Sequence, residues 1–455
     1  MAIKEPNRGS GTMSTATTGT GSSALQLLEQ ETIARVKWRL IPLLFLCYYA
    51  AYLDRVNVGF AALHMNKALG LTAAAFGLGG GIFFVGYFLA EIPSNLILER
   101  VGARVWIARI LLTWGVISAL TAFVWNEWSF YVVRFLLGIA EAGYYPGIIL
   151  YLTWWFPSAY RSRMIALFMT AIPVAVITGS WASGFILGMD GVWGLAGWQW
   201  LFIIEAMPAI ILGVVVYFYL TDRPEQAHWL PERQRTWLSE RLAAERTQRE
   251  RIRHFALGET LRNPRVWALT LVYFGQNVTG YGFVLFLPQI VKQFGLTDVQ
   301  TGFVSALPFI GALIGIFLWA RASDHTGARD KMCGASLLIS AALLICCLAF
   351  QASPVATMVV LVLFQLAASG IAPTFWPLPT AMLTGSAAAG GIALINSVGN
   401  LGGFLGPYAM GLVRDATGSF PLGLLAIAMG SVVGGLVVLL LGHDRRLEQA
   451  PVAAQ

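Results

Sequence analysis

The chain has 455 residues, of which 57% are hydrophobic and only 12% are charged, and its formal net charge is +7. A soluble protein carries roughly 25% charged residues, so a water-soluble chain of this length could not bury so much apolar side chain. The composition therefore excludes an ordinary soluble protein and predicts a chain that is solvated by the lipid bilayer.

The chain opens with a polar segment. Residues 1–24 are rich in Gly, Ser and Thr and have no apolar core, which argues against a signal peptide, and we predict that 1–34 form a disordered cytoplasmic tail. Two sets of apolar stretches follow, each stretch long enough to cross a bilayer. The first set lies at 38–60, 75–98, 105–125, 129–155, 162–187 and 198–220, and the second at 266–291, 300–320, 332–351, 355–383, 387–412 and 420–442.

These stretches predict an all-α membrane protein with twelve transmembrane helices in two six-helix bundles. We assign 35–220 to the N-terminal bundle and 266–443 to the C-terminal bundle. The long connection at 221–265 is rich in Arg and Glu and predicts a cytoplasmic loop with a solvated helix. Residues 444–455 are predicted to form a cytoplasmic tail.

The two bundles share a repeat with an offset of 225 residues. K-A-L-G-L-T at 67–72 matches K-Q-F-G-L-T at 292–297, and E-R-V-G-A-R at 99–104 matches D-H-T-G-A-R at 324–329. Duplicated halves in a chain this apolar are typical of secondary transporters, whose binding site lies between the repeats near the middle of the membrane.

The basic residues predict the orientation. Most of the 30 Lys and Arg residues fall in the tails, the central connection and alternate short loops, whereas the loops of the opposite side hold only Lys67, Lys292 and Arg414. Because positive residues stay inside, both termini are predicted to be cytoplasmic. This bias explains the positive net charge without nucleic-acid binding.

The sequence lacks the motifs of ATPases, metalloproteins and enzymes. The sequence has no G-x-x-x-x-G-K-[ST] phosphate loop and no His/Cys/carboxylate cluster with metal-ligand spacing, so we predict neither an ATPase nor a bound metal or cofactor. All five histidines lie outside the predicted spans, which argues against acid–base catalysis in the membrane. The chain is therefore not predicted to be an enzyme.

Charged residues inside the spans are the candidates for function, because burying a charge in a membrane is costly. A guanidinium group in a partly dry cavity binds carboxylates, and desolvation lets a carboxyl group take up a proton. Structural ion pairs that join helices are the alternative. For Glu91, Arg109 and Glu205, which lie near span ends, snorkelling or helix locking is favoured. The charged candidates all lie in the first half: Asp54, Arg55, Glu91, Arg109, Arg134, Glu141 and Glu205.

The loops after the second and eighth spans resemble the signature loop of the major facilitator superfamily, G-x-x-x-D-R-x-G-R-R. The first copy departs from it, with Asn95 for the first Gly, Glu99 for Asp and Ala103 for Arg, and the second has His325 for Arg. The resemblance implies the major facilitator fold and a loop that gates transport. Its residues here are Glu99, Gly102, Arg104, Asp324, Gly327 and Arg329.

Three further segments resemble the anion:cation symporters of bacteria: Y-L-D-R-V-N-V-G-F-A at 52–61, R-F-L-L-G-I-A-E-A-G-Y-Y-P-G at 134–147 and I-N-S-V-G-N-L-G-G-F-L-G-P-Y at 395–408. This resemblance implies proton coupling by Asp54 and Glu141, and an interaction of Arg134 with these acids. It implies substrate contacts from Arg55, Tyr52, Tyr87, Gln276, Trp376 and Asn400.

We therefore predict a monomeric symporter of the bacterial inner membrane that imports a small organic acid anion together with a proton. The anion is an aromatic acid or a hydroxy or sugar acid. An organic anion or organophosphate antiporter is the alternative, although phosphate sites usually need two facing basic residues and only Arg55 is well placed. The G-x-x-x-G-P motif of antiporters is absent from the fifth span, which favours symport.

Overall fold

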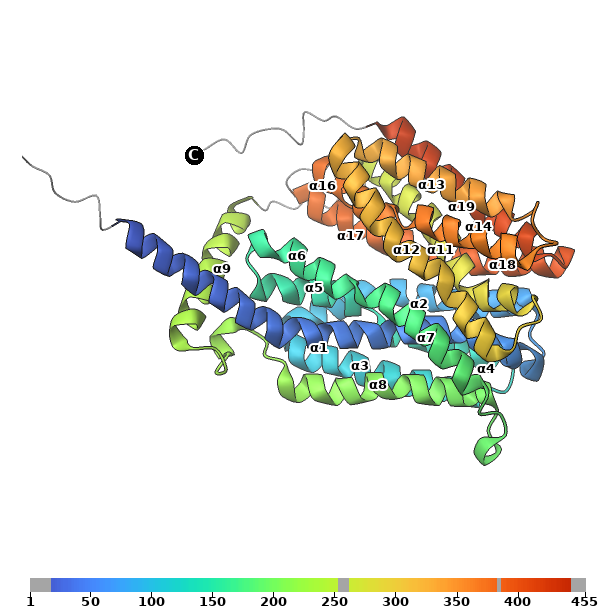
Figure 1. Ribbon diagram of the computed structural model, residues 1–455. Coiled ribbons are helices and arrows are strands. Elements are labelled where there is room, and N and C mark those ends of the chain that lie inside the picture. Colours follow the sequence, from blue (N-terminus) through green and yellow to red (C-terminus); the bar gives the residue numbers. More distant parts are fainter. Residues whose placement is uncertain (1–17, 253–261, 383–385, 443–455) are drawn as a thin grey trace, which may run out of the picture.

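The computed structural model describes residues 18–252, 262–382 and 386–442, and these residues are helical without any strand (Figure 1). The predicted tail at 444–455, the start of the tail at 1–34 and residues 253–261 of the central connection lie outside the described residues. The N-terminal half, meaning α1 to α8, contains α1 (Thr18–Leu69), α2 (Ala73–Val101), α3 (Ala103–Leu120), α4 (Glu127–Glu141), α5 (Tyr144–Trp155), α6 (Ser158–Met169), α7 (Ala171–Leu187) and α8 (Gly197–Tyr219).

The connecting helix α9 (Glu232–Ile252) leads to the C-terminal half, meaning α11 to α19. This half contains α11 (Pro264–Lys292), α12 (Asp298–Thr326), α13 (Arg329–Cys346), α14 (Pro354–Ala368), α15 (Ile371–Phe375), α16 (Pro377–Met382), α17 (Ser386–Asn400), α18 (Gly402–Thr417) and α19 (Phe420–Leu441). In the described part of the chain, nine helical segments are long and apolar enough to cross a membrane. The other three predicted spans correspond to α11, α13 and the pair α17–α18.

Four predicted spans are interrupted rather than continuous. The fourth span divides into α4 and α5, the fifth into α6 and α7, the tenth into α14 to α16, and the eleventh into α17 and α18. The break between α4 and α5 lies at Gly143, whose φ of 83° is left-handed, and an added Cβ there would meet Ser94 of α2. Interrupted helices beside a cavity are typical of transporter binding sites.

The repeat seen in the sequence has a structural counterpart at the starts of α2 and α12. Thr72 Oγ1 accepts the backbone N–H of Ala75 at 3.1 Å, and Thr297 Oγ1 accepts that of Gln300 at 3.2 Å. These side chains satisfy orphan donors of the first helical turn, so the shared G-L-T motif fixes where each helix begins. Both helices have 29 residues, as is expected of corresponding helices in two related bundles.

The first helix begins earlier than predicted. Residues 18–34, assigned to a disordered tail, form the first turns of α1, and Thr32 is fully buried. Arg35 Nη1 donates to Gln234 Oε1 of α9 at 3.1 Å, and Tyr160 of α6 donates to Glu29 at 3.0 Å. Contacts with α9 and α6, which are distant in sequence, therefore stabilise the start of α1, and only its first turns share the Gly, Ser and Thr composition of the predicted tail.

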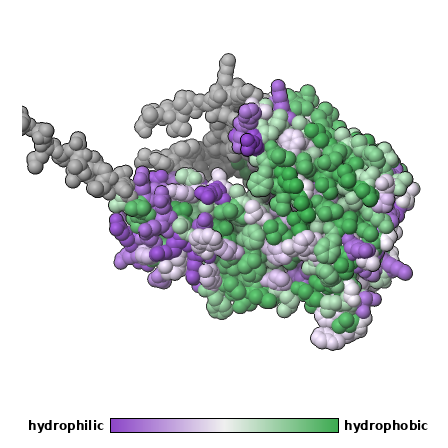
Figure 2. Space-filling view, in the orientation of Figure 1, coloured by the Kyte–Doolittle hydropathy of each residue, from purple (hydrophilic) through white to green (hydrophobic). Residues whose placement is uncertain are grey.

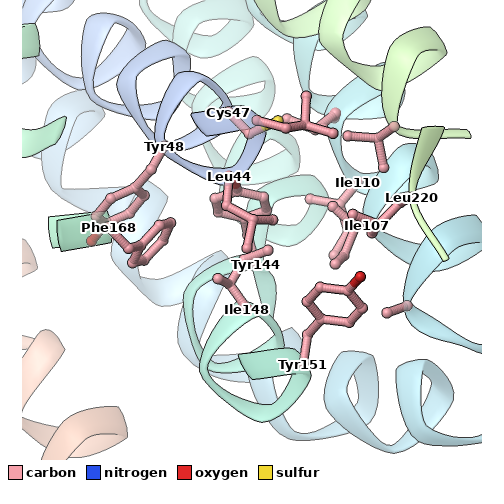
Figure 3. Close-up of a cluster of buried hydrophobic side chains, with 14 of the residues drawn as sticks. Leu44, Cys47, Tyr48, Ile107, Ile110, Tyr144, Ile148, Tyr151, Phe168 and Leu220 are labelled. Carbon is pink, nitrogen blue, oxygen red and sulfur yellow. The ribbon is translucent and has the colours of Figure 1, made fainter. Parts of the chain in front are cut away.

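The N-terminal half has a dense core where its helices cross. Side chains of α1, α3, α5 and α6 gather there, including Leu44, Ile107, Tyr144 and Phe168 (Figure 3). The outer surface of the bundles is largely apolar, whereas hydrophilic side chains gather around α9 (Figure 2). Apolar helix faces turned outward are expected where lipid replaces water.

The two halves pack mainly along three helix pairs: α2 with α18, α7 with α12, and α1 with α11. We call the end where α1 begins and α9 lies the termini end, and the opposite end the far end (Figure 1). At the far end, Asp298 accepts hydrogen bonds from Lys292 at 2.7 Å and from His64 of the other half at 3.0 Å. Asp415 of α18 also accepts the first two backbone N–H groups of α2, at 2.9 and 2.8 Å. Polar contacts therefore close the far end.

Candidate functional site

The adjacent residues Asp54 and Arg55 face different parts of the protein, because neighbouring side chains on a helix point about 100° apart. Asp54 is 2% exposed and faces α3, where it accepts hydrogen bonds from Trp114 Nε1 and from Ser118 Oγ at 2.6 Å. Asn57, on the same face of α1, donates to it at 3.0 Å. Asp54 is therefore held inside the N-terminal half by three neutral donors.

Arg55 faces the interface between the halves. Its Nη2 and Nε both donate to Glu141 Oε1, at 2.5 and 3.2 Å, and its Nη1 donates to the Tyr281 hydroxyl of α11 at 3.2 Å. Glu141 ends α4, where the helix dipole disfavours a carboxylate, so the guanidinium group offsets that cost. Arg55 thereby joins α1 to α4 and also contacts the opposite half.

A small cavity of about 20 Å³, enough for one water molecule, lies beside this ion pair in this conformation. The N-terminal half supplies both guanidinium groups, and the C-terminal half supplies the Tyr281 hydroxyl together with apolar side chains. The cavity lining therefore combines cationic groups with apolar walls, and the halves must move apart before it can hold a ligand larger than water. Its lining residues are Arg55, Gly80, Phe83, Phe84, Arg134, Tyr281, Val284, Leu285 and Pro407.

Arg134 lines the cavity two helical turns before Glu141, and the sequence did not predict that a second guanidinium group would face the substrate. Its side chain is buried, and its guanidinium carbon lies 5.2 Å from the centre of the Phe83 ring. In the described part of the chain, Arg134 Nε has no hydrogen-bond partner, while electrostatic interactions link the residue to Asp54 and Glu141. Arg134 is therefore the less tightly held of the two arginines.

The tyrosines predicted to contact substrate surround Arg55 instead of lining the cavity. The Arg55 guanidinium carbon lies 5.1 Å from the ring centre of Tyr52 and 6.0 Å from that of Tyr87. Such cation–π contacts hold a partly desolvated guanidinium in place. Both tyrosines thus position the cation in this conformation.

The three candidates of the C-terminal half are set apart from the cavity lining. Trp376 packs on Tyr273, with ring centres 5.1 Å apart, and Asn400 accepts a hydrogen bond from Asn277 at 3.4 Å. Gln276 lies on α11 five residues before Tyr281, and its buried Oε1 has no partner among the described residues. Tyr281 is the residue of the C-terminal half that reaches Arg55 in this conformation.

Each predicted gating loop places a glycine with positive φ directly after a long helix, although the ψ angles of the two glycines differ, 154° at Gly102 and 8° at Gly327. Gly102 has a φ of 98° and Gly327 a φ of 61°, and both follow the last turn of a long helix. In the first loop, the Arg104 backbone N–H donates to Asp222 at 2.7 Å, an acid just after α8 that the sequence motif does not include. Glu99, Asp324 and Arg104 have exposed side chains in this conformation, and Arg329 is half-buried.

Glu91 of α2 connects the two halves on the termini side of the cavity. It is 4% exposed and accepts hydrogen bonds from Asn396 Nδ2 at 2.9 Å and Ser397 Oγ at 2.8 Å, both on α17. Snorkelling is therefore excluded for this residue, because its carboxylate is buried between the halves. The geometry is that of a contact which must break when the halves separate at the termini end.

The helical bundles, the internal repeat and the cavity between the halves define a membrane transport protein. A family model of the Major Facilitator Superfamily matches residues 44–302 and 269–455. The chain therefore belongs to the Major Facilitator Superfamily, and it is a transporter and not an enzyme.

Relatives match most of the chain. A protein of Agrobacterium vitis named "Putative tartrate transporter" is 51% identical over 394 residues, 86% of each chain. A quinolone resistance transporter of Acinetobacter baumannii is 41% identical over 86% of this chain and 90% of its own length. The inner membrane transport protein RhmT of Escherichia coli is 40% identical over 81% of this chain and 85% of its own length.

Solved structures support the fold. A bacterial homologue of the human lysosomal transporter Spinster, in an inward-facing and occupied conformation, gives a TM-score of 0.71 at 18% identity and covers 88% of this chain and 96% of its own. A D-xylose-proton symporter gives a TM-score of 0.71 at 13% identity, over 90% of this chain and 99% of its own. At these identities the likeness concerns the fold alone.

Proposed function

We propose that this transporter imports a small organic anion, an aromatic or a hydroxy or sugar carboxylate, by proton symport with alternating access. The observation that carries the proposal is the Arg55–Glu141 ion pair at a cavity between the halves, with Tyr281 of the opposite half on the same guanidinium group. A guanidinium group binds carboxylates through parallel hydrogen bonds, so this site suits a carboxylate substrate.

The ion pair offers a mechanism for coupling. Arg55 directs two donors at one oxygen of Glu141, and an incoming carboxylate would compete for the same donors. Glu141 would then lose its cation in a site where it is 2% exposed, and uptake of a proton would remove the cost of its buried charge. Substrate binding at Arg55 and proton binding at Glu141 therefore favour each other.

Asp54 fits a second proton-binding role, because it is buried on the α3 side and held by neutral donors rather than by a short ion pair. In the proposed cycle the halves rock about the cavity: the far end opens when the Asp298 and Asp415 contacts break, and the termini end opens when Glu91 leaves α17. Glu99, Gly102 and Arg104, with Asp324, Gly327 and Arg329, are proposed to lock the states through their two loops.

The relatives support the substrate class and the location. Tartrate, named for the Agrobacterium vitis relative, is a hydroxy acid, and the Escherichia coli relative is named for the inner membrane. We propose that this chain works as a monomer in the bacterial inner membrane, with its termini on the cytoplasmic side. Trp376, Gln276 and Asn400 are proposed to reach the substrate only after the halves have moved.

Uptake into proteoliposomes tests the proposal. Labelled tartrate, a sugar acid, phthalate, hydroxyphenylacetate and a quinolone are offered with and without an inward proton gradient; the quinolone is included because of the Acinetobacter baumannii relative. We expect one carboxylate class to accumulate, a protonophore to abolish the accumulation, and Arg55→Gln to lose it. Accumulation that is the same with and without the proton gradient contradicts symport.

An antiporter is the second candidate, and Arg134 is the observation that favours it. Because Arg55 and Arg134 both line the cavity, the site carries two cationic groups, the number expected for a phosphate ester or a doubly charged anion. An antiporter predicts uptake that requires preloaded anion and is stimulated by it. Symport predicts net uptake into empty vesicles, so the same assay separates the two.

A further inference from the structure

Glu205 of α8 is a buried carboxyl group that the anion cavity does not use. The residue is 3% exposed, and Ser183 of α7 donates to its Oε1 at 2.8 Å. In the described part of the chain, its Oε2 has no hydrogen-bond partner. An ionised carboxylate with one oxygen unsatisfied inside a protein is costly, whereas a protonated carboxyl group carries no charge to desolvate.

The two arginines nearest to this site interact with other acids than Glu205. Glu141 is paired with Arg55, and Arg134 interacts electrostatically with Asp54 and Glu141. Among the described residues, Glu205 forms no ion pair, and it interacts electrostatically with Asp54, which carries a charge of the same sign. The helices packed around α8 supply neutral partners. Ser183 of α7 donates to Glu205, while Trp114 and Ser118 of α3 donate to Asp54. A proton is therefore the available means of neutralising Glu205.

Asn57 connects the two carboxyl groups. It lies one turn after Asp54 on α1, donates to Asp54 Oδ1 at 3.0 Å, and also interacts with Glu205. Asn57 Oδ1 has no hydrogen-bond partner among the described residues. One amide thus serves both acids, so a change in the ionisation of Glu205 alters the hydrogen bonding of the amide that stabilises Asp54.

We propose that Glu205 is a proton-binding residue of the transport cycle, protonated in this conformation and coupled to Asp54 through Asn57. The inference rests on the proposed proton symport. Two carboxyl groups of the same sign in one buried site favour holding a single proton between them, because ionising both is opposed by their repulsion. When the halves rearrange and Glu205 loses its proton to water, its negative charge would raise the proton affinity of Asp54.

Infrared difference spectroscopy of the purified full chain in nanodiscs tests protonation directly and needs no substrate. We expect a C=O stretching band of a protonated carboxyl group near neutral pH, shifted in D₂O, that is lost in Glu205→Gln and kept in Glu240→Gln, whose side chain is exposed on α9. Ser183→Ala removes the hydrogen bond to Oε1 and should shift the same band. A spectrum unchanged by both Glu205→Gln and Ser183→Ala overturns the proposal, and Ser183→Ala alone decides it if Glu205→Gln does not fold.

Transport of labelled tartrate tests the coupling. We expect Glu205→Gln to lose accumulation driven by the proton gradient while tartrate exchange between preloaded vesicles persists, and Glu240→Gln to retain both. Normal accumulation in Glu205→Gln with the band absent also overturns the role in coupling. Failure of wild-type protein to carry any acid of the panel would contradict the proposed function, whereas the infrared result would still report on the proton of Glu205.

Discussion

Replacing Glu141 by glutamine tests whether the Arg55–Glu141 pair is the electrostatic centre of the site. The carboxylate is 2% exposed and accepts two donors of Arg55, at 2.5 and 3.2 Å, so its removal leaves a buried guanidinium group without its counter-ion. Breaking one side of a buried pair typically costs about 3–5 kcal/mol. We expect the lower end, about 3 kcal/mol, because Arg55 is 16% exposed to the cavity and keeps its Tyr281 contact.

The measurement is the apparent melting temperature of detergent-purified protein, followed by size-exclusion chromatography after heating. A loss of this size should lower the melting temperature by about 5 °C relative to Glu240→Gln, the exposed control. The double variant Arg55→Gln, Glu141→Gln should recover most of the loss, because no unpaired charge remains. A single variant as stable as the control, or a double variant less stable than the single one, would refute the reasoning.

Three further predictions concern coupling and the closure of the two ends. Asp54→Asn should abolish uptake driven by the proton gradient while substrate exchange persists; loss of exchange in a folded protein would contradict a pure proton role. Glu91→Ala removes two hydrogen bonds across the halves, so it should speed maleimide labelling of Val284→Cys in the cavity, and an unchanged rate would show that this contact closes nothing. Gly77→Val places its side chain against a backbone carbonyl of α18 and should lower the melting temperature, whereas Gly280→Ala, whose Cβ meets only a side chain at 3.8 Å, should not; equal effects would contradict close packing of α2 on α18.

Much of the architecture could be predicted from local features of the sequence. Apolar stretches of sufficient length fix the helices, because backbone polar groups in a bilayer must pair within their own segment. The G-L-T motifs determine where α2 and α12 begin, since each threonine caps its own helix at short range. The rarity of charge in the spans likewise singled out Arg55 and Glu141 as candidates, and the structure places them in one ion pair.

Local features were insufficient where a side chain's direction depends on how helices rotate and pack. The sequence could not assign Asp54 to α3 and Arg55 to the cavity, although the two residues are adjacent. It considered Glu91 and Glu205 as residues near span ends, yet both are buried, one against α17 and the other beside Ser183. Their depth depends on neighbours brought in by other helices.

The sequence by itself therefore determined the class of fold, the repeat and the set of charged residues, because composition, helix length and capping act over a few turns of one helix. Only the tertiary structure decided which charges meet. Arg55 and Tyr281 are 226 positions apart and come from different halves, as do Glu91 and Asn396. Their contact depends on how two separately formed bundles pack against each other, and no local pattern of residues encodes that packing.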